Sequence, residues 1–210
     1  MKYLHAMLDI ETLSTHTSRA VVLSFGVVPF NLTKSGPVLG QRYMVILNAL
    51  KQIAAGRRVD QSTIDFWAKQ SKEARAHWLD PKFSREGVIV LRDDRDDNGS
   101  YIMRNLFDLS HGGLQLEPEF QVWSNGAVFD FGNLENLMDF SPMGGESPWP
   151  YRAVRDMRSV IRVNPEYRIG DVQQPGPEKN FNPVLAHDPV ADCEWQIAKL
   201  WQHMPEESLT

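Results

Sequence analysis

The sequence predicts one mixed α/β domain over residues 1–210. Three observations predict it: strand-length apolar segments fill the first fifty residues, helical periodicity begins after residue 60, and no repeat or linker interrupts the chain. A length of 210 residues fits a single domain and is sufficient to bury a core without disulfides.

Three strands are predicted at the start of the chain. Residues 3–11 alternate between an apolar face and a face that includes two acids. Val21–Val28 is a β-branched run of strand length, and Arg42–Leu47 forms the third strand. A turn over residues 31–37, rich in Gly, Pro, Ser and Asn, joins the second and third strands. An antiparallel meander is the simplest arrangement of these three.

Helices dominate the rest of the chain. Apolar side chains recur at helical spacing over Gln61–Trp78, which predicts one helix there. Before the final helix, the sequence then predicts a strand at Val88–Leu91, a helix at Ile102–Leu109, a strand at Phe120–Trp123 and a helix at Phe129–Met138. Asp188 is a good N-cap and Pro189 suits the first position of the last helix.

Composition restricts the class of function. Lys and Arg total 22 against 27 Asp and Glu, a net charge of −5, which argues against a long cationic surface for DNA. A small site whose positive charge is a metal ion remains compatible with this balance. Cys193 is the one cysteine, so no intramolecular disulfide forms, as expected in a reducing cytoplasm. The apolar run Ala20–Phe30 is too short for a membrane helix, and no membrane partner is expected.

Two acids on the first strand are the first sign of chemistry. Asp9 and Glu11 are two residues apart, so both carboxylates leave the same face of the strand. Adjacent anions repel each other, and a divalent cation is the simplest compensation. The alternative is a strand end that exposes both acids to water.

Two further sites carry acids at predicted helix starts. Asp130 follows a strand and an Asn125-Gly126 turn, and His187 precedes a helix whose first turn holds Asp192. Neutral imidazole can accept a proton near pH 7, and a carboxylate can complete a metal site. Each acid could instead serve only as a helix cap or a partner of the helix dipole. The helical wheel places Asp192 nearly opposite the apolar stripe of its helix, which leaves its distance from Asp9 open.

These segments occur in the order of a known set of motifs. Leu8–Thr12, Asn125–Asp130, and His187 five residues before Asp192 resemble the three exonuclease motifs of the DEDDh 3′–5′ exonuclease superfamily. The resemblance spans nearly the whole chain. Asn125 is five residues before Asp130, whereas many members of the superfamily place their asparagine four residues before.

Two intermediate segments narrow the resemblance. Ile64–Ser71 with Arg75, and Arg155–Arg158, are similar to a branch that includes mycobacterial RNase AS and phage exodeoxyribonuclease A. The resemblance to the phage enzyme slightly favours single-stranded DNA over RNA as the substrate, whereas the resemblance to the mycobacterial enzyme favours RNA. A cytoplasmic location is expected, in the host if the chain is phage-encoded.

The resemblance implies an RNase H-like fold, with an antiparallel meander and parallel strands flanked by helices. It implies a metal-dependent exonuclease that releases nucleoside 5′-monophosphates from single-stranded 3′ ends. Asp9, Glu11 and Asp192 would hold one Mg²⁺ or Mn²⁺, and Asp9 would bridge to a second ion supported by Asp130. His187 would deprotonate the attacking water. A homodimer is a candidate assembly, because several relatives form one.

Substrate contacts are predicted on both sides of these acids. The resemblance assigns the terminal nucleotide to Thr12 and Leu13, and Asn125 is placed with the substrate-binding residues. The arginines at 152, 155, 158 and 162 would share one face of a helix and contact phosphates there, or form a solvated face instead. Trp67 could stack on a base, although its apolar stripe favours core packing.

Two functions of another class are alternatives to that of an enzyme. One is a non-catalytic nucleic-acid-binding module that kept the fold. The other is a calcium-binding interaction protein, because Asp94–Gly99 matches the first half of a calcium loop. The twelfth position of that loop is Asn105 in place of the bidentate glutamate, which favours a solvated hairpin tip.

Overall fold

The computed structural model describes residues 1–93, 98–139, 146–163 and 187–209. Its strands are β1 (Tyr3–Thr12), β2 (Val22–Thr33), β3 (Gly36–Leu39), β4 (Arg42–Ile46), β5 (Val88–Arg92), β6 (Leu116–Ser124) and β7 (Val154–Asp156). Its α-helices are α1 (Ala49–Ala54), α2 (Gln61–Lys69), α3 (Lys72–Leu79), α4 (Ser100–Phe107), α5 (Ala127–Asp139), α6 (Met157–Val163) and α7 (Pro189–His203). Two short 3-10 helices are η1 (Tyr151–Ala153) and η3 (Glu206–Ser208).

The strands form one mixed sheet in the order β5-β4-β2-β1-β6-β7, with β3 paired to β2. β1 pairs antiparallel with β2, and β2 with β4, which confirms the predicted meander. β6 runs parallel to β1 and β7 parallel to β6, so the carboxyl ends of these three strands lie at one edge of the sheet. β5 runs parallel to β4. The expected fold class is therefore confirmed.

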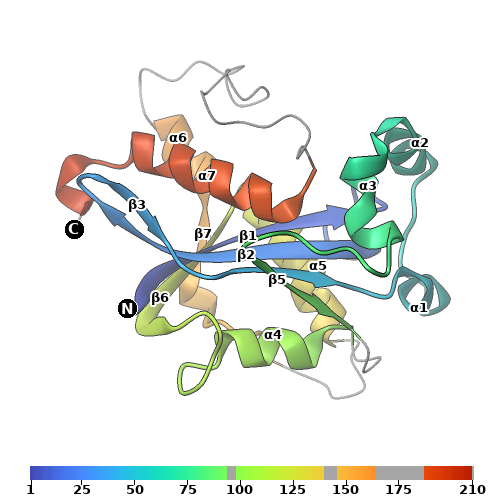
Figure 1. Ribbon diagram of the computed structural model, residues 1–210, viewed down its shortest axis with the longest axis horizontal. Coiled ribbons are helices and arrows are strands. Elements are labelled where there is room, and N and C mark those ends of the chain that lie inside the picture. Colours follow the sequence, from blue (N-terminus) through green and yellow to red (C-terminus); the bar gives the residue numbers. More distant parts are fainter. Residues whose placement is uncertain (94–97, 140–145, 164–186, 210) are drawn as a thin grey trace.

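Helices cover both faces of the sheet (Figure 1). Alternate side chains of β1 enter two different cores, because successive residues of a strand point to opposite faces. Ala6, Leu8 and Ile10 pack with α4 and α5, whereas Met7 packs with α6 and α7. Asp9 and Glu11 have the parity of Met7, so they lie on the α7 side, at the end of the strand.

The start of α7 packs directly on the sheet at Gly26. This glycine pairs with Asp9 across the β1–β2 ladder, and a Cβ at position 26 would collide with the backbone carbonyl of Pro189. A glycine is therefore required for this close approach. The approach brings the first turn of α7 to the level of Asp9 on the sheet.

Several elements differ from the sequence prediction. The single helix predicted over Gln61–Trp78 is two helices, α2 and α3, because Ser71 caps a new helix by accepting a hydrogen bond from the Ala74 N–H at 3.1 Å. The predicted turn at residues 31–37 is a longer hairpin: β2 continues to Thr33, and Gly36 and Pro37 belong to β3. Helix α1 was not predicted, since its six residues carry little periodicity.

The prediction that the arginines at 152, 155, 158 and 162 share one face of a helix is wrong. Arg152 lies in η1, Arg155 in β7 and Arg158 in α6, so these residues cannot share one helix face.

The acids of the calcium-like segment, Asp94 and Asp96, lie outside the described residues. Within the described ranges, no helix is both long and apolar enough to cross a membrane.

Candidate active site

Asp9 occupies the last part of β1 and faces α7. Burial raises the pKa of Asp9 to about 7, while a hydrogen bond from Gln196 acts in the opposite direction and the charge of Asp188 adds to the increase. The Nε2 of Gln196 donates to Oδ1 of Asp9 at 2.7 Å. Asp9 is thus a half-buried acid held by an amide of α7.

Glu11 lies two residues further along the same face and is 9% exposed. Its pKa is raised well above the ordinary value by burial, and then by the charges of Asp9, Asp192, Asp188 and Asp130. The β1–β2 register shifts between Glu11 and Thr12. Such irregularities often re-aim a side chain beside an active site.

Asp130 and Asp192 reach the same region from two helices. Burial and then the charge of Asp9 raise the pKa of Asp130, against the charge of Arg158. Burial and Asp9 also raise the pKa of Asp192, to about 8. Asp9, Glu11, Asp130 and Asp192, here called the acidic cluster, are therefore electrostatically coupled. The helical wheel alone could not show that Asp192 lies near Asp9. Asp192 comes close to Asp9 because α7 begins over the end of β1.

His187 completes the group from the residue before the α7 cap. One ligand atom from each of Glu11, His187 and Asp192 lies within 4.8 Å of the other two. The His187 ring packs edge-to-face on Phe66, with centroids 4.9 Å apart, and on Trp67 at 5.9 Å. Burial lowers the pKa of His187, which favours the neutral imidazole.

The residues of this site fit a divalent cation. Carboxylate oxygens are the ligands that Mg²⁺ and Mn²⁺ prefer. Ser24 pairs with Glu11 on the neighbouring strand, and its hydroxyl is fully buried with no hydrogen-bond partner in the described chain. Four buried or half-buried carboxylates, of which Asp9 raises the pKa of the other three, are costly without a cation. Asp9 lies outside the tight group formed by Glu11, His187 and Asp192.

The residues predicted to hold the terminal nucleotide follow directly on β1. Thr12 is 9% exposed, and its hydroxyl donates to the Ser14 carbonyl at 2.8 Å. Leu13 is half-buried and its carbonyl accepts from the Asp60 N–H. Trp67 is 3% exposed, and its Nε1 donates to the Thr12 carbonyl at 2.9 Å. Trp67 therefore supports Thr12 and His187 from the core, and its stacking on a base stays a prediction.

Asn125 and Arg158 lie together at the start of α5. The Arg158 Nε donates to Oδ1 of Asn125 at 3.2 Å. Beside them is a surface cavity of about 370 Å³, lined by Thr17, Gly126, Ala127, Val128, Phe129, Asp156, Arg158 and Ser159. Arg155 instead turns its Nη1 onto the carbonyls of Arg152 and Val154. Arg158 of the predicted strip thus lies near the acidic cluster, where its charge lowers the pKa of Asp130.

Three residues around the site were not among the predicted site residues. Gln196 lies four residues after Asp192, so helical spacing alone could have placed it on the same face. Asp188 was predicted only as a cap, and it also raises the pKa of Asp9, Glu11 and Asp192. Arg85 carries no sequence signal, because its partners lie about a hundred residues away.

The fold and the acidic cluster define the class of protein. An RNase H-like mixed sheet whose four acids and one histidine converge at the end of β1 is the arrangement of the DEDDh 3′–5′ exonuclease superfamily. The family model of the Rv2179c-like 3′–5′ exoribonuclease domain matches residues 4–204, and the chain belongs to that family. The narrower resemblance to RNase AS and exodeoxyribonuclease A stays a prediction.

Solved structures support the same fold. An exonuclease I structure discussed for its processivity superposes with a TM-score of 0.57 at 17% identity, covering 97% of this chain and 42% of that one. Escherichia coli exonuclease I in complex with a dT13 oligonucleotide gives a TM-score of 0.56 at 15% identity, covering 94% and 40%. The chain therefore spans less than half the length of these proteins. Direct comparison with curated protein sequences gave no match.

Proposed function

We propose that this protein is a divalent-metal-dependent 3′–5′ exonuclease that releases nucleoside 5′-monophosphates from single-stranded nucleic acid. The observation that carries the proposal is the convergence of Glu11, Asp192 and His187, whose ligand atoms lie within 4.8 Å of one another. Two further acids, the half-buried Asp9 and the buried Asp130, lie beside them. A neutral imidazole next to carboxylates is the arrangement needed to accept a proton from water near a bound cation.

Each residue has a distinct role in this proposal. Asp9, Glu11 and Asp192 would hold one ion, and Asp9 with Asp130 would support a second. When bound, the ions would supply Lewis-acid activation of water and neutralise charge on the phosphate. His187 takes the proton of the attacking water at a ring nitrogen, because its lowered pKa keeps it unprotonated at neutral pH. The water oxygen bonds to phosphorus and the bond from phosphorus to the 3′ oxygen breaks. The released 3′ oxygen takes a proton from solvent to become a hydroxyl, and His187 gives its proton to solvent.

The substrate is held next to this group. Thr12 and Leu13 follow the two acids of β1 and would bind the terminal nucleotide. Arg158 lines the cavity at the start of α5 and donates to Asn125, and both would contact the sugar-phosphate backbone. The net charge of −5 fits a site in which bound cations, more than protein charge, attract the polyanion.

RNA and DNA are both substrates to be tested. The family description names an exoribonuclease domain, which favours RNA. The sequence resemblance to a phage exodeoxyribonuclease favoured DNA, and a protein of similar fold has been crystallised with dT13. The 2′-hydroxyl distinguishes the two substrates, so paired oligonucleotides of one sequence separate these alternatives.

The test is a 5′-labelled oligonucleotide assay with DNA and RNA side by side. With Mg²⁺ or Mn²⁺ we expect a ladder that shortens one nucleotide at a time, and no product with a chelator. His187→Ala should abolish the ladder, whereas the exposed His111→Ala should leave it unchanged. Internal cuts in the wild type, or a ladder that persists with chelator, would contradict the proposal. Binding without cleavage would instead support a non-catalytic module.

A further inference from the structure

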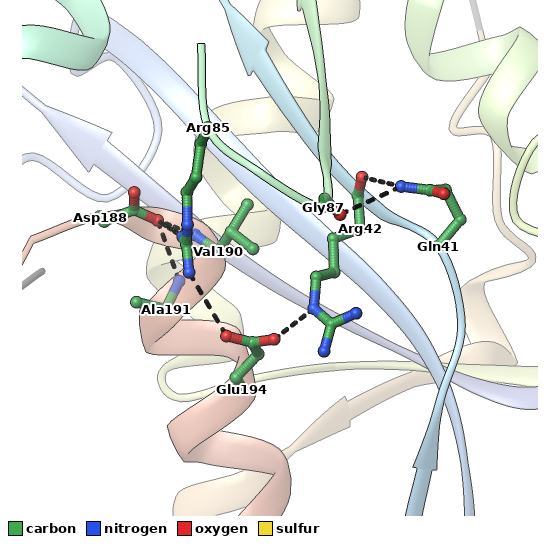
Figure 2. Close-up of polar contacts among 8 residues, drawn as sticks. All are labelled: Gln41, Arg42, Arg85, Gly87, Asp188, Val190, Ala191 and Glu194. Atoms are coloured by element: carbon green, nitrogen blue, oxygen red, sulfur yellow. Dashed lines mark hydrogen bonds and ion pairs between the residues drawn. The ribbon is translucent and has the colours of Figure 1, made fainter. Parts of the chain in front are cut away.

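Arg85 connects a surface loop to the start of α7 (Figure 2). It lies in the segment 80–87 between α3 and β5, and its Nη1 is 2.5 Å from Oδ1 of Asp188. Its Nη2 is 3.5 Å from Oε2 of Glu194, six residues after Asp188 in the chain. The side chains of Arg85 and Asp188 are only 18% and 8% exposed. The ion pair is therefore largely shielded from solvent.

Asp188 uses the same oxygen to cap the helix. Its Oδ1 accepts hydrogen bonds from the N–H groups of Val190 and Ala191, both at 3.0 Å. The residue before it, His187, has a φ of 64°. A left-handed conformation is unfavourable for a non-glycine residue and persists only where its surroundings enforce it. The capping carboxylate and its partner Arg85 are directly adjacent to that strained residue.

The loop that carries Arg85 is itself attached to the sheet. Gln41, immediately before β4, donates from Nε2 to the carbonyl of Gly87 at 3.3 Å. The Val88 N–H at the start of β5 donates to the Arg85 carbonyl at 3.1 Å. Arg85 therefore reaches Asp188 from a backbone anchored to two strands, which suits a fixed contact.

Arg85 also supplies positive charge beside the acidic cluster. Burial raises the pKa of Asp188, and Arg85 is the largest influence that lowers it. Arg85 likewise lowers the pKa of Asp192 against the effect of burial. Removing one partner of a shielded ion pair leaves an uncompensated charge. Without Arg85, Asp188 would add repulsion at the point where the cluster already concentrates negative charge.

We propose that Arg85 is a positioning residue for the exonuclease reaction: by holding Asp188, it fixes the turn that places His187 and Asp192 against Glu11. This inference rests on the function proposed above. Among the residues that the structure describes, Arg85 makes no hydrogen bond or ion pair with the acidic cluster or with His187, so its contact with Asp188 is the one by which it holds the turn.

Arg42 provides a matched control from the same network. Its Nε pairs with Oε1 of Glu194, whereas Arg85 pairs with Oε2 (Figure 2). In the described part of the chain, no bond joins Arg42 to Asp188. A loss of charge at position 42 therefore perturbs Glu194 but leaves the capping carboxylate in place.

The kinetic test compares Arg85→Ala, Arg85→Lys and Arg42→Ala on a 5′-labelled oligonucleotide, well below each melting temperature. We expect Arg85→Ala to lower kcat by about 10- to 100-fold with KM changed less than about twofold, because small displacements of reacting groups cost rate more than binding. Arg85→Lys should recover part of the loss, since it keeps the charge without the paired geometry. Arg42→Ala should remain close to the wild type. Equal kcat in Arg85→Ala and wild type would overturn the inference.

A second measurement does not depend on activity. Amide hydrogen exchange at Val190 and Ala191 should accelerate about tenfold or more in Arg85→Ala and remain unchanged in Arg42→Ala, because the Asp188 cap loosens only in the first. If Arg85→Ala does not fold, Arg85→Gln replaces it in both measurements. Unchanged exchange would overturn the inference, whatever the kinetics. An inactive wild type with the expected exchange would contradict the proposed nuclease function while leaving the Asp188 contact established.

Discussion

Gln196 and Asp9 are joined across the interface between α7 and β1, with 2.7 Å between Nε2 and Oδ1. The same helix that brings Asp192 to the acidic cluster thus supplies a neutral donor to the acid on the central strand. Gln196 is 3% exposed, so water does not replace it easily. A hydrogen bond to a charged group is worth about 1.5–3 kcal/mol, and this one favours the ionised form of Asp9.

Gln196→Met should therefore weaken metal binding. Methionine has a similar volume but no donor, so Asp9 loses the interaction that favours its charged form. We expect the Mg²⁺ concentration for half-maximal activity to rise about tenfold, which corresponds to about 1.4 kcal/mol. Gln61→Met, at an exposed position of α2, is the control. A Mg²⁺ titration of initial rate measures the effect, and equal half-saturation in both variants would exclude a role for Gln196 toward the metal.

Glu11 should contribute to activity at the expense of stability. Burial and four neighbouring carboxylates raise its pKa, so its ionised form is unfavourable in the metal-free protein. Glu11→Gln removes that charge and retains the shape. We expect activity to fall at least about 100-fold while the metal-free melting temperature at pH 8 rises by a few degrees.

Glu117→Gln is the matched control for this change. Glu117 is in β6, its side chain is 39% exposed, and it pairs with Lys2 at 3.9 Å. Activity and melting temperature should both stay near wild type in that variant. A lower metal-free melting temperature in Glu11→Gln would show that the acidic cluster is not under electrostatic strain.

The metal-free protein should lose stability as the pH rises. The pKa values of Asp9 and Asp192 are raised from 3.8 to about 7 and about 8, so the folded protein retains protons that the unfolded chain releases. Their contribution to stability is complete below about pH 4 and is lost as the pH rises through 7 to 8. A bound cation would replace those protons, so stabilisation by Mg²⁺ or Mn²⁺ should increase over the same interval.

Thermal melting between pH 5.5 and 8.5, with chelator and with saturating Mn²⁺, measures this dependence. The increase in melting temperature on adding Mn²⁺ should be larger at pH 8 than at pH 6, since ligands must be deprotonated to bind. Asp9→Asn should abolish most of that increase. An increase that is the same at both pH values would mean that the ion binds away from the acidic cluster.

The sequence predicted those parts of the site that follow from local rules. Strand alternation places Asp9 and Glu11 on one face, and the Asp188-Pro189 pair defines the start of α7. Capping chemistry also explains the principal error in the helices, since Ser71 begins α3 inside the predicted single helix. The periodicity of the apolar residues continues across this break, so periodicity alone could not detect it.

Other features depend on contacts that local patterns do not encode. Trp67 lies on an apolar stripe in the sequence, but its hydrogen bond to the Thr12 carbonyl follows from the packing of α2 against the end of β1. The pairing of Arg85 with Asp188 joins residues 103 positions apart. Arg152 and Arg155 have helical spacing, yet they lie in η1 and β7, because pairing with β6 determines the local conformation.

Arg158 should contribute to the salt dependence of substrate binding. Its guanidinium lies beside Asn125 and the cavity at the start of α5, and its charge lowers the pKa of Asp130. Each phosphate neutralised on a single strand contributes roughly 0.7 to the slope of log affinity against log salt. Arg158→Ala should therefore flatten that slope by about 0.7.

Binding is best measured with a labelled single-stranded oligonucleotide in Ca²⁺, over a range of KCl concentrations. Arg152→Ala is the control, because Arg152 is exposed and packs over the Tyr151 ring at 5.4 Å. Arg155→Ala tests the rest of the predicted strip, and its effect should be smaller, since Nη1 of Arg155 is bound to backbone carbonyls. A slope that is unchanged in Arg158→Ala but flattened in Arg152→Ala would place the phosphate path over η1, away from the start of α5.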